Sequence, residues 1–148
     1  MKVVIQRVSK ASSHTNHKFQ TNIDLGLVLL VGFGVGDTSA VLEKMAKKIV
    51  TLRIFADNED KMSKSIQDVY GKLLVIPNFT LFGEVKGQNK PYFGSAAEPV
   101  VAKKLFTQFI GQLKKTKIPT YAGEFGAYMQ IELTNDGPVT LVLDSSGL

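Results

Sequence analysis

Runs of apolar and β-branched residues along the chain predict six β-strands. They fall at residues 2–8, 19–23, 25–33, 72–76, 125–133 and 139–143. The strand at 25–33 is apolar on both faces, which predicts a central place in a sheet. The strand at 72–76 is expected to stop at Pro77, because proline lacks the N–H that a central strand donates.

Two further segments place apolar residues at helical spacing. The first helix has three candidate N-caps, Asp37, Thr38 and Ser39. Its spacing continues through Leu42, Met45, Ala46, Ile49 and Arg53. The second helix is expected to open with a capping box at residues 95–98, and Pro99 lies in its first turn. Its apolar stripe consists of Ala102, Leu105, Phe106, Phe109 and Leu113.

The order of these elements mixes local strand pairs with two helices, which predicts the α+β class. Polar stretches predict loops at 58–64 and 83–94 and a turn at 134–138. A length of 148 residues predicts a single domain, 1–148, that is large enough to bury a hydrophobic core without stabilising cross-links. The 44% hydrophobic and 21% charged residues exclude a disordered, collagen-like or coiled-coil chain.

The net charge of +5 favours an anionic partner. Of the 18 basic residues, Arg7 and Arg53 are arginines and the others are lysines, which suit phosphate better than base edges. Five lysines crowd the second helix and its exit, and either a polyanion or plain solvation explains them equally well. They are Lys103, Lys104, Lys114, Lys115 and Lys117.

Several kinds of site are disfavoured by the residues available. The absence of cysteine excludes disulfides, thiolate metal sites and cysteine nucleophiles. Residues 32–36 are glycine-rich, but Asp37 takes the place of the third fingerprint glycine, and no crossover to a parallel strand is evident. A simple turn is therefore favoured over a dinucleotide site. His14 and His17 have the spacing of a metal pair, yet they fall in an expected turn and are better explained as surface residues.

Serine-hydrolase motifs and signals for targeting or membrane insertion are also missing, so a cytoplasmic protein with no membrane contact is expected. Two loop-like segments remain unusually specific. One is Pro77-Asn78-Phe79-Thr80-Leu81, where a proline ends a strand. The other is Asn135-Asp136-Gly137-Pro138-Val139-Thr140, where a Gly-Pro step precedes a strand.

With these segments the chain resembles the D-aminoacyl-tRNA deacylases, also called D-tyrosyl-tRNA(Tyr) deacylases, from Met1 to about Ser145. The opening Ile5-Gln6-Arg7-Val8 and the stretch Arg53-Ile54-Phe55-Ala56-Asp57 are similar to the family. Phe125-Gly126-Ala127, Met129-Gln130 and residues 135–140 match its C-terminal signature, which is the most specific signal.

The resemblance implies a homodimer with a barrel-like core of mixed and antiparallel sheets, two main helices, and active sites at the subunit interface. It implies proofreading of translation: hydrolysis of D-aminoacyl-tRNA to free amino acid and tRNA, with glycyl-tRNA as a second substrate class. No metal or cofactor is implied, and no DNA partner is expected. The 2′-hydroxyl of the tRNA is expected to assist water, and a Gly-cisPro motif to exclude L side chains by steric conflict.

The resemblance also implies roles for particular residues. Those expected to carry catalysis are Asn78, Phe79 and Thr80. Those expected to bind substrate and select its chirality are Gly137, Pro138, Phe125, Met129 and Asn135. The tRNA is expected to contact Lys86, Lys90, Lys103 and Lys104.

The chain departs from the family pattern at two points. Pro77 and Asn78 stand where the family has serine and glutamine, and Lys90 and Tyr92 stand where it has arginine and serine. These changes leave an alternative open, namely a divergent tRNA-binding homologue with weak or no deacylase activity. A dinucleotide-binding module built on residues 32–36 is a distant third.

Overall fold

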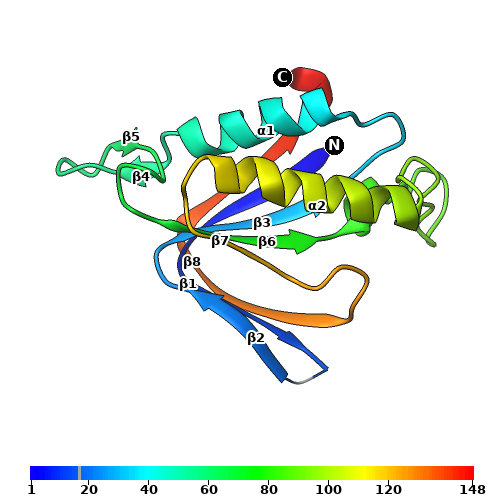
Figure 1. The fold of residues 1–148 in the computed structure, drawn as a ribbon, viewed down its shortest axis with the longest axis horizontal. Helices are drawn as coiled ribbons and strands as arrows, with labels where there is room; N and C mark the ends of the chain where they lie inside the picture. The colour runs from blue at the N-terminus through cyan, green and yellow to red at the C-terminus, as the bar shows by residue number, and fades with distance from the viewer. Residues whose placement is uncertain (17) are drawn as a thin grey trace.

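The computed structural model describes residues 1–16 and 18–148. Its strands are β1 (Lys2–Thr15), β2 (Lys18–Ile23), β3 (Gly26–Gly32), β4 (Phe55–Ala56), β5 (Met62–Lys64), β6 (Lys72–Pro77), β7 (Thr120–Ala122) and β8 (Met129–Asp144). Its helices are α1 (Ser39–Thr51), α2 (Pro99–Lys115) and the short 3-10 turns η1 (Phe79–Phe82) and η2 (Ser145–Gly147). Both long helices lie on the same side of the sheet (Figure 1).

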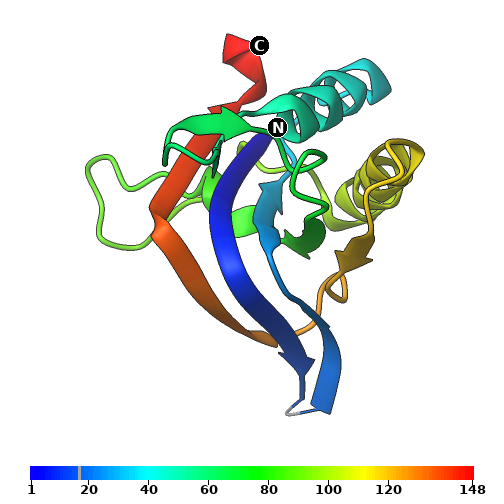
Figure 2. The ribbon, with the colours of Figure 1, turned by 90° about the vertical axis from the view of Figure 1, so that its left-hand side faces the viewer.

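The main sheet is mixed and strongly curved. Its strands follow the order β2-β1-β3-β6-β7, and β8 also pairs with β1. β1 is long enough to pair with two strands along one edge. Its residues 2–8 pair with β3 and its residues 11–15 pair with β2. β8 runs antiparallel along the other edge of β1. The sheet therefore curls until it is nearly closed (Figure 2). The predicted α+β class with a barrel-like core and two main helices is confirmed.

Both long helices are crossovers between parallel strands. β3 pairs in parallel with β6, and β6 pairs in parallel with β7. The expectation that no parallel crossover follows the strand at 25–33 is wrong, because the chain returns through α1 and the β4–β5 hairpin before β6 begins. The carboxyl ends of β3 and β6 consequently meet at one edge of the sheet, beside η1 and the start of α2.

Apolar residues fill both faces of the central strands. Leu27 and Leu29 of β3 face the helices and pack in one cluster with Phe109 of α2, whereas Val28 faces a second cluster inside the curl. All four side chains are fully buried. This confirms the central place predicted for the strand at 25–33, since only a strand covered on both faces buries consecutive residues.

The start of α2 differs from the expected cap, whereas the start of α1 agrees with it. The N-cap of α2 is Glu98, and the Ser95 hydroxyl donates to the Glu84 carboxylate at 2.7 Å, so the capping box predicted at 95–98 is wrong. The N-cap of α1 is Thr38, one of the three candidates. Asp37 instead links the N-terminus to the turn after β3. Its carboxylate accepts from the Met1 amino group at 2.6 Å and from the Gly34 N–H at 2.7 Å.

Several strand boundaries also differ from the prediction. The strands expected at 125–133 and 139–143 form a single strand, β8, and the segment 125–127 lies in the loop before it. The predicted loop at 58–64 contains β5, which pairs with β4. β7 has three residues and was not predicted.

His14 lies in β1 rather than in a turn, and its ring meets Phe19 edge-on at 5.8 Å. His17 is outside the described residues, so the preference for two surface histidines over a metal pair is untested. Within residues 1–16 and 18–148, no helix is long and apolar enough to cross a membrane.

Candidate active site

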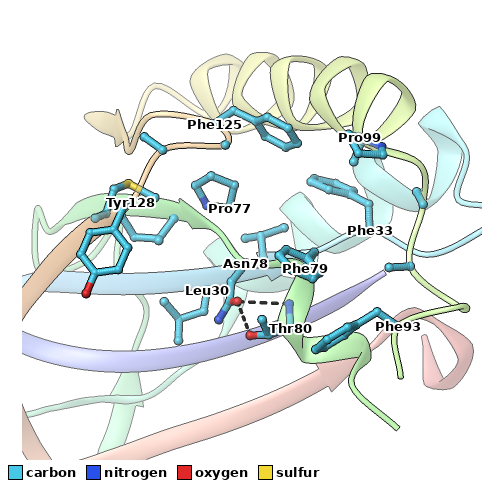
Figure 3. Close-up of a pocket in the computed structure, with 18 of the residues that line it drawn as sticks. Leu30, Phe33, Pro77, Asn78, Phe79, Thr80, Phe93, Pro99, Phe125 and Tyr128 are labelled. Carbon is cyan, nitrogen blue, oxygen red and sulfur yellow. Dashed lines mark hydrogen bonds between the residues drawn. The ribbon is translucent and has the colours of Figure 1, made fainter. Parts of the chain in front are cut away.

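A cavity of about 800 Å³ lies where the ends of β3 and β6 meet η1, the start of α2 and the loop before β8. This volume is within the range of small-molecule and cofactor sites. Its walls are mostly apolar and rich in flat side chains (Figure 3). The flat side chains are Phe33, Phe79, Phe93, Phe125, Tyr128 and Pro99.

The aromatic walls are held in place by edge-to-face and tilted ring packing. Phe79 and Phe93 meet with ring centroids 5.0 Å apart, and Phe125 packs on Phe106 of α2 at 5.9 Å. Phe33 in turn contacts Phe106 at 6.5 Å, so the walls are anchored in the helix core. Such a slot suits a planar ring, because nucleobases bind proteins by stacking on aromatic side chains.

The polar part of the cavity is the turn that follows β6. Pro77 ends the strand, and the N–H of Asn78 donates to the Val31 carbonyl at 2.8 Å, which ties the turn to β3. The side-chain oxygen of Asn78 accepts from the Thr80 N–H at 3.2 Å and also from the Thr80 hydroxyl (Figure 3). A backbone N–H only donates, so the amide oxygen must face Thr80 and the amide nitrogen must point elsewhere.

A second unusual segment projects from β8. Gln6 pairs with Thr140 and Val8 pairs with Asn135, so residues 136–139 bulge out opposite Arg7. The Gly137–Pro138 peptide bond within this bulge is cis. The Asn135 side chain bridges the two ends of the bulge and ties it to β1. Its oxygen accepts from the Val139 N–H at 2.8 Å, and its amide nitrogen donates to the Gln6 side chain at 2.9 Å.

Arg7 of β1 holds the bulge in place through hydrogen bonds from its guanidinium group. Its Nε donates to the Asp136 carbonyl at 2.8 Å, and its Nη1 donates to the Ile54 carbonyl at 2.6 Å. The Arg7 side chain is only 11% exposed, so the guanidinium itself is largely shielded from water, although its contact with Asp136 lies at the surface. A planar guanidinium holds two acceptors in fixed directions, which a lysine does not.

The structure brings together five of the residues predicted for the site. Asn78, Phe79, Thr80, Phe125 and Met129 all line the cavity. Asn135, Gly137 and Pro138 instead sit on the β8 bulge, away from the lining of this cavity. The four predicted tRNA contacts are exposed, two before α2 and two on it: Lys86, Lys90, Lys103 and Lys104.

Several residues that shape the site are not among those predicted from the sequence. Phe33, Phe93 and Tyr128 supply flat walls but come from three separate segments. Arg7 belongs to the opening motif Ile5-Gln6-Arg7-Val8, for which the sequence predicts no individual role. Its scarcity was a usable signal, because the chain has two arginines among its 18 basic residues and a lysine would not form this fork.

The glycine-rich segment 32–36 has a packing role. A Cβ on Gly34 would lie 2.7 Å from the Phe82 ring, so glycine is needed there for close approach. The Gly34 N–H already donates to the Asp37 carboxylate, whose charge opposes a phosphate at this position. Both observations agree with the turn that the sequence favoured over a dinucleotide site.

The clearly shifted carboxyl groups lie outside the cavity lining. A hydrogen bond from Ser63 lowers the pKa of Asp57, and one from Ser65 lowers the pKa of Asp68. The pKa of Asp144 is lowered mainly by the Ser146 N–H. These groups fix local turns and do not belong to the cavity.

Comparison with known proteins gives one consistent result. The D-Tyr-tRNA(Tyr) deacylase family matches residues 4–144. The D-aminoacyl-tRNA deacylase of Thermosipho africanus (strain TCF52B) is 42% identical over 98% of this chain and 97% of its own length. That of Roseiflexus castenholzii (strain DSM 13941 / HLO8) is 44% identical over 99% and 93%.

A solved structure described as c-Myc DNA Unwinding Element Binding Protein superimposes with a TM-score of 0.91 at 39% identity, over 97% of this chain and 98% of the other. The family match spans both specific segments, the turn after β6 and the bulge in β8. The resemblance recognised from the sequence is thereby confirmed: the chain belongs to the D-Tyr-tRNA(Tyr) deacylase family.

Proposed function

We propose that this protein hydrolyses the ester bond between a D-amino acid and the terminal ribose of tRNA, releasing free amino acid and free tRNA. The observation that carries the proposal is the cavity itself. It combines a slot of flat apolar side chains with the polar turn Asn78-Phe79-Thr80 at one edge. A terminal adenosine that carries an amino acid has the same two parts, a planar base and a polar ester.

The proposed orientation places the adenine against the aromatic walls and the ester beside the turn. Phe33, Phe125 and Tyr128 offer faces or edges for the base. The N–H groups of Asn78 and Thr80 are already bonded within the protein, so the Phe79 N–H and the Asn78 amide nitrogen are the donors proposed to face the negative charge that develops on the ester carbonyl oxygen. Pro77 brings no N–H to this edge, so the donors come from the residues that follow it.

The proposed reaction needs no covalent enzyme intermediate. The oxygen of a water molecule attacks the ester carbonyl carbon, and its proton passes to the 2′-hydroxyl of the ribose or to solvent. The carbon–oxygen bond to the ribose then breaks, and the ribose oxygen takes up a proton. The protein contributes position and charge stabilisation, both of which accelerate acyl transfer.

We propose that chirality is selected in a homodimer, in which the Gly137–Pro138 bulge of one subunit enters the cavity of the other. Exposure of the bulge, its separation from its own cavity and its support by Arg7 favour this arrangement. Backbone carbonyls there would collide with an L side chain and leave a D side chain free. Glycyl-tRNA, which has no side chain to exclude, is a second proposed substrate.

Glycine at position 137 is required by two features of the bulge. Its φ is +147°, and an added Cβ would lie 2.7 Å from Val139 and 3.3 Å from the Arg7 guanidinium. Gly137→Ala is therefore expected to displace the bulge and to weaken discrimination between D and L substrates. Unchanged discrimination in this variant would argue against the role proposed for the bulge.

Exposed lysines near the cavity are proposed to bind the tRNA. Lys86, Lys90, Lys103 and Lys104 are exposed and are proposed to contact tRNA phosphates. A cytoplasmic location, without membrane or DNA as partner, remains our expectation. The alternative is a tRNA-binding homologue with weak or no activity, because Pro77 and Asn78 depart from the family pattern.

Hydrolysis of D-tyrosyl-tRNA and L-tyrosyl-tRNA by the purified protein, with and without a chelator, tests the proposed function. Rapid release of D-tyrosine only, unaffected by the chelator, is expected. Equal cleavage of both substrates would refute chiral selection. Binding of tRNA without release of amino acid would establish the alternative.

A further inference from the structure

The net positive charge of the protein is concentrated on one layer, formed by the outer faces of α1 and α2. These helices carry seven lysines and a single glutamate, a net charge of +6 in a protein whose total is +5. The rest of the chain, with eleven basic and twelve acidic residues, is close to neutral. Lysines that only solvate the surface would be spread evenly, and the two helices would then not carry all of the net positive charge.

The two helices present these charges together. They lie side by side over the same face of the sheet (Figures 1 and 2). Lys115 of α2 is close enough to Glu43 of α1 to help lower the pKa of that carboxyl, although the hydrogen bond from Lys47 is the main cause. All the lysines of the layer are exposed: Lys44, Lys47, Lys48, Lys103, Lys104, Lys114 and Lys115.

The layer is also continuous with the cavity. Pro99 and Ala102, in the first turn of α2, line the cavity wall. Lys103 and Lys104 follow directly, and Lys114 and Lys115 lie at the far end of the same helix. At 1.5 Å per residue, the lysines of α2 extend over about 18 Å. A polyanion whose end occupies the cavity would meet this row next.

We propose that the basic layer of α1 and α2 docks the phosphate backbone of the tRNA acceptor stem, so that the paired stem lies across the helices while its single-stranded end enters the cavity. The proposal rests on the proposed function and adds residues far from the cavity, namely Lys44, Lys48, Lys114 and Lys115. Lysines act as point charges on phosphates and do not read base edges. The docking is therefore independent of the sequence of the stem.

The test compares Lys114→Gln/Lys115→Gln with a matched control, Lys10→Gln/Lys18→Gln, which removes the same charge from exposed positions on β1 and β2. Each protein is assayed on full-length D-tyrosyl-tRNA and on the D-tyrosyl ester of the trinucleotide CCA. Binding of uncharged tRNA is measured over a range of salt concentrations. This last assay works even if the protein proves to have no deacylase activity.

We expect the α2 variant to raise KM for the full-length substrate severalfold and to leave kcat and the trinucleotide kinetics unchanged. Two lost phosphate contacts should reduce the slope of log affinity against log salt by about 2. The control should match wild type. The proposal is overturned if both variants have the wild-type slope, or if KM rises equally for the trinucleotide.

A DNA duplex of acceptor-stem length serves as a further probe. Tighter binding of this duplex than of tRNA, lost in the α2 variant, would assign the layer to DNA and overturn the proposal. Failure of the proposed function has a different signature, namely no hydrolysis of either ester by wild type. In that case the salt dependence of tRNA binding still decides the docking surface.

Discussion

The side-chain oxygen of Asn78 accepts hydrogen bonds from both the N–H and the hydroxyl of Thr80. The hydroxyl proton of Thr80 is thus held within the turn, and the lone pairs of its oxygen are left to accept from a ligand. Thr80 then presents an acceptor to the cavity, which suits the protonated amino group of an aminoacyl ester. Asn78 sets this polarity although it is one methylene shorter than the family's glutamine.

Replacing Asn78 tests this arrangement. Asn78→Ala should lower kcat/KM for D-tyrosyl-tRNA at least about tenfold, because Thr80 loses the orientation that lets it accept from the charged amino group, and a hydrogen bond to a charged group is worth about 1.5–3 kcal/mol. Asn78→Asp keeps the accepting oxygen and should lose much less. Steady-state kinetics on the two variants and on Thr80→Val provide the measurement. If the aspartate variant falls as far as the alanine variant, Asn78 does not act through Thr80.

Arg7 is expected to be far more sensitive to substitution than Arg53. Arg7→Lys loses the fork that joins the Asp136 and Ile54 carbonyls, which should cost about 3 kcal/mol in the free energy of unfolding. Arg53→Lys, at an exposed position, should stay within about 0.5 kcal/mol of wild type. Urea unfolding measures both effects.

The same Arg7 variant should also cleave L-tyrosyl-tRNA faster relative to the D substrate, because the Gly137–Pro138 bulge loses its support. This ratio separates a role in positioning from a loss of stability, since unfolding would reduce both activities together. If Arg7→Lys and Arg53→Lys are equally stable, the two hydrogen bonds of the Arg7 guanidinium do not stabilise the fold.

The helices were predictable because each carries an apolar stripe that spans more than two turns, from Leu42 to Val50 in α1 and from Ala102 to Leu113 in α2. β7 was not, since the three residues Thr120–Ala122 are too few to show a period. The break predicted at residues 134–138 was wrong for a different reason. The Asn135 side chain closes the bulge by bonding Val139, so pairing with β1 resumes beyond it and β8 remains one strand.

The site was predictable only in part. Asn78, Phe79 and Thr80 are adjacent in sequence, so a family motif identifies them together. Phe33 follows β3 and Tyr128 lies between β7 and β8, and the pairing of both β3 and β7 with β6 brings these distant segments to the same cavity. Physical patterns in one sequence carry no signal for such convergence.

Two glycines should respond in opposite ways to alanine. A Cβ on Gly26 would lie 1.9 Å from the Lys72 carbonyl oxygen, so Gly26→Ala must push β3 and β6 apart. We expect a loss of at least about 3 kcal/mol of stability or no folded protein. Gly111 lies in α2 with open space around it, and Gly111→Ala should add about 0.5–1 kcal/mol. Thermal and urea unfolding of the pair provide the check, and a neutral Gly26→Ala would refute the strand spacing.

Asp57 should make stability depend on pH at the β4–β5 turn. Its carboxylate accepts from the Ser63 hydroxyl at 2.6 Å and from the N–H groups of Glu59 and Lys61, and these bonds lower its pKa. A lowered folded-state pKa means that the contribution is present above the unfolded value of about 3.9. It is lost as pH falls through the lower, folded value.

The measurement is the difference in unfolding free energy between wild type and Asp57→Asn, taken by urea titration from pH 7 down to pH 3. Other carboxyls titrate in the same range, and the pKa values of Asp68 and Asp144 are also lowered, so the difference isolates Asp57. Asparagine still accepts from the backbone but offers a single oxygen to the turn. Wild type should be the more stable at pH 7, and the gap should shrink below pH 4 as Asp57 takes up its proton. A gap that stays constant over this range would show that the carboxylate charge contributes nothing to the turn.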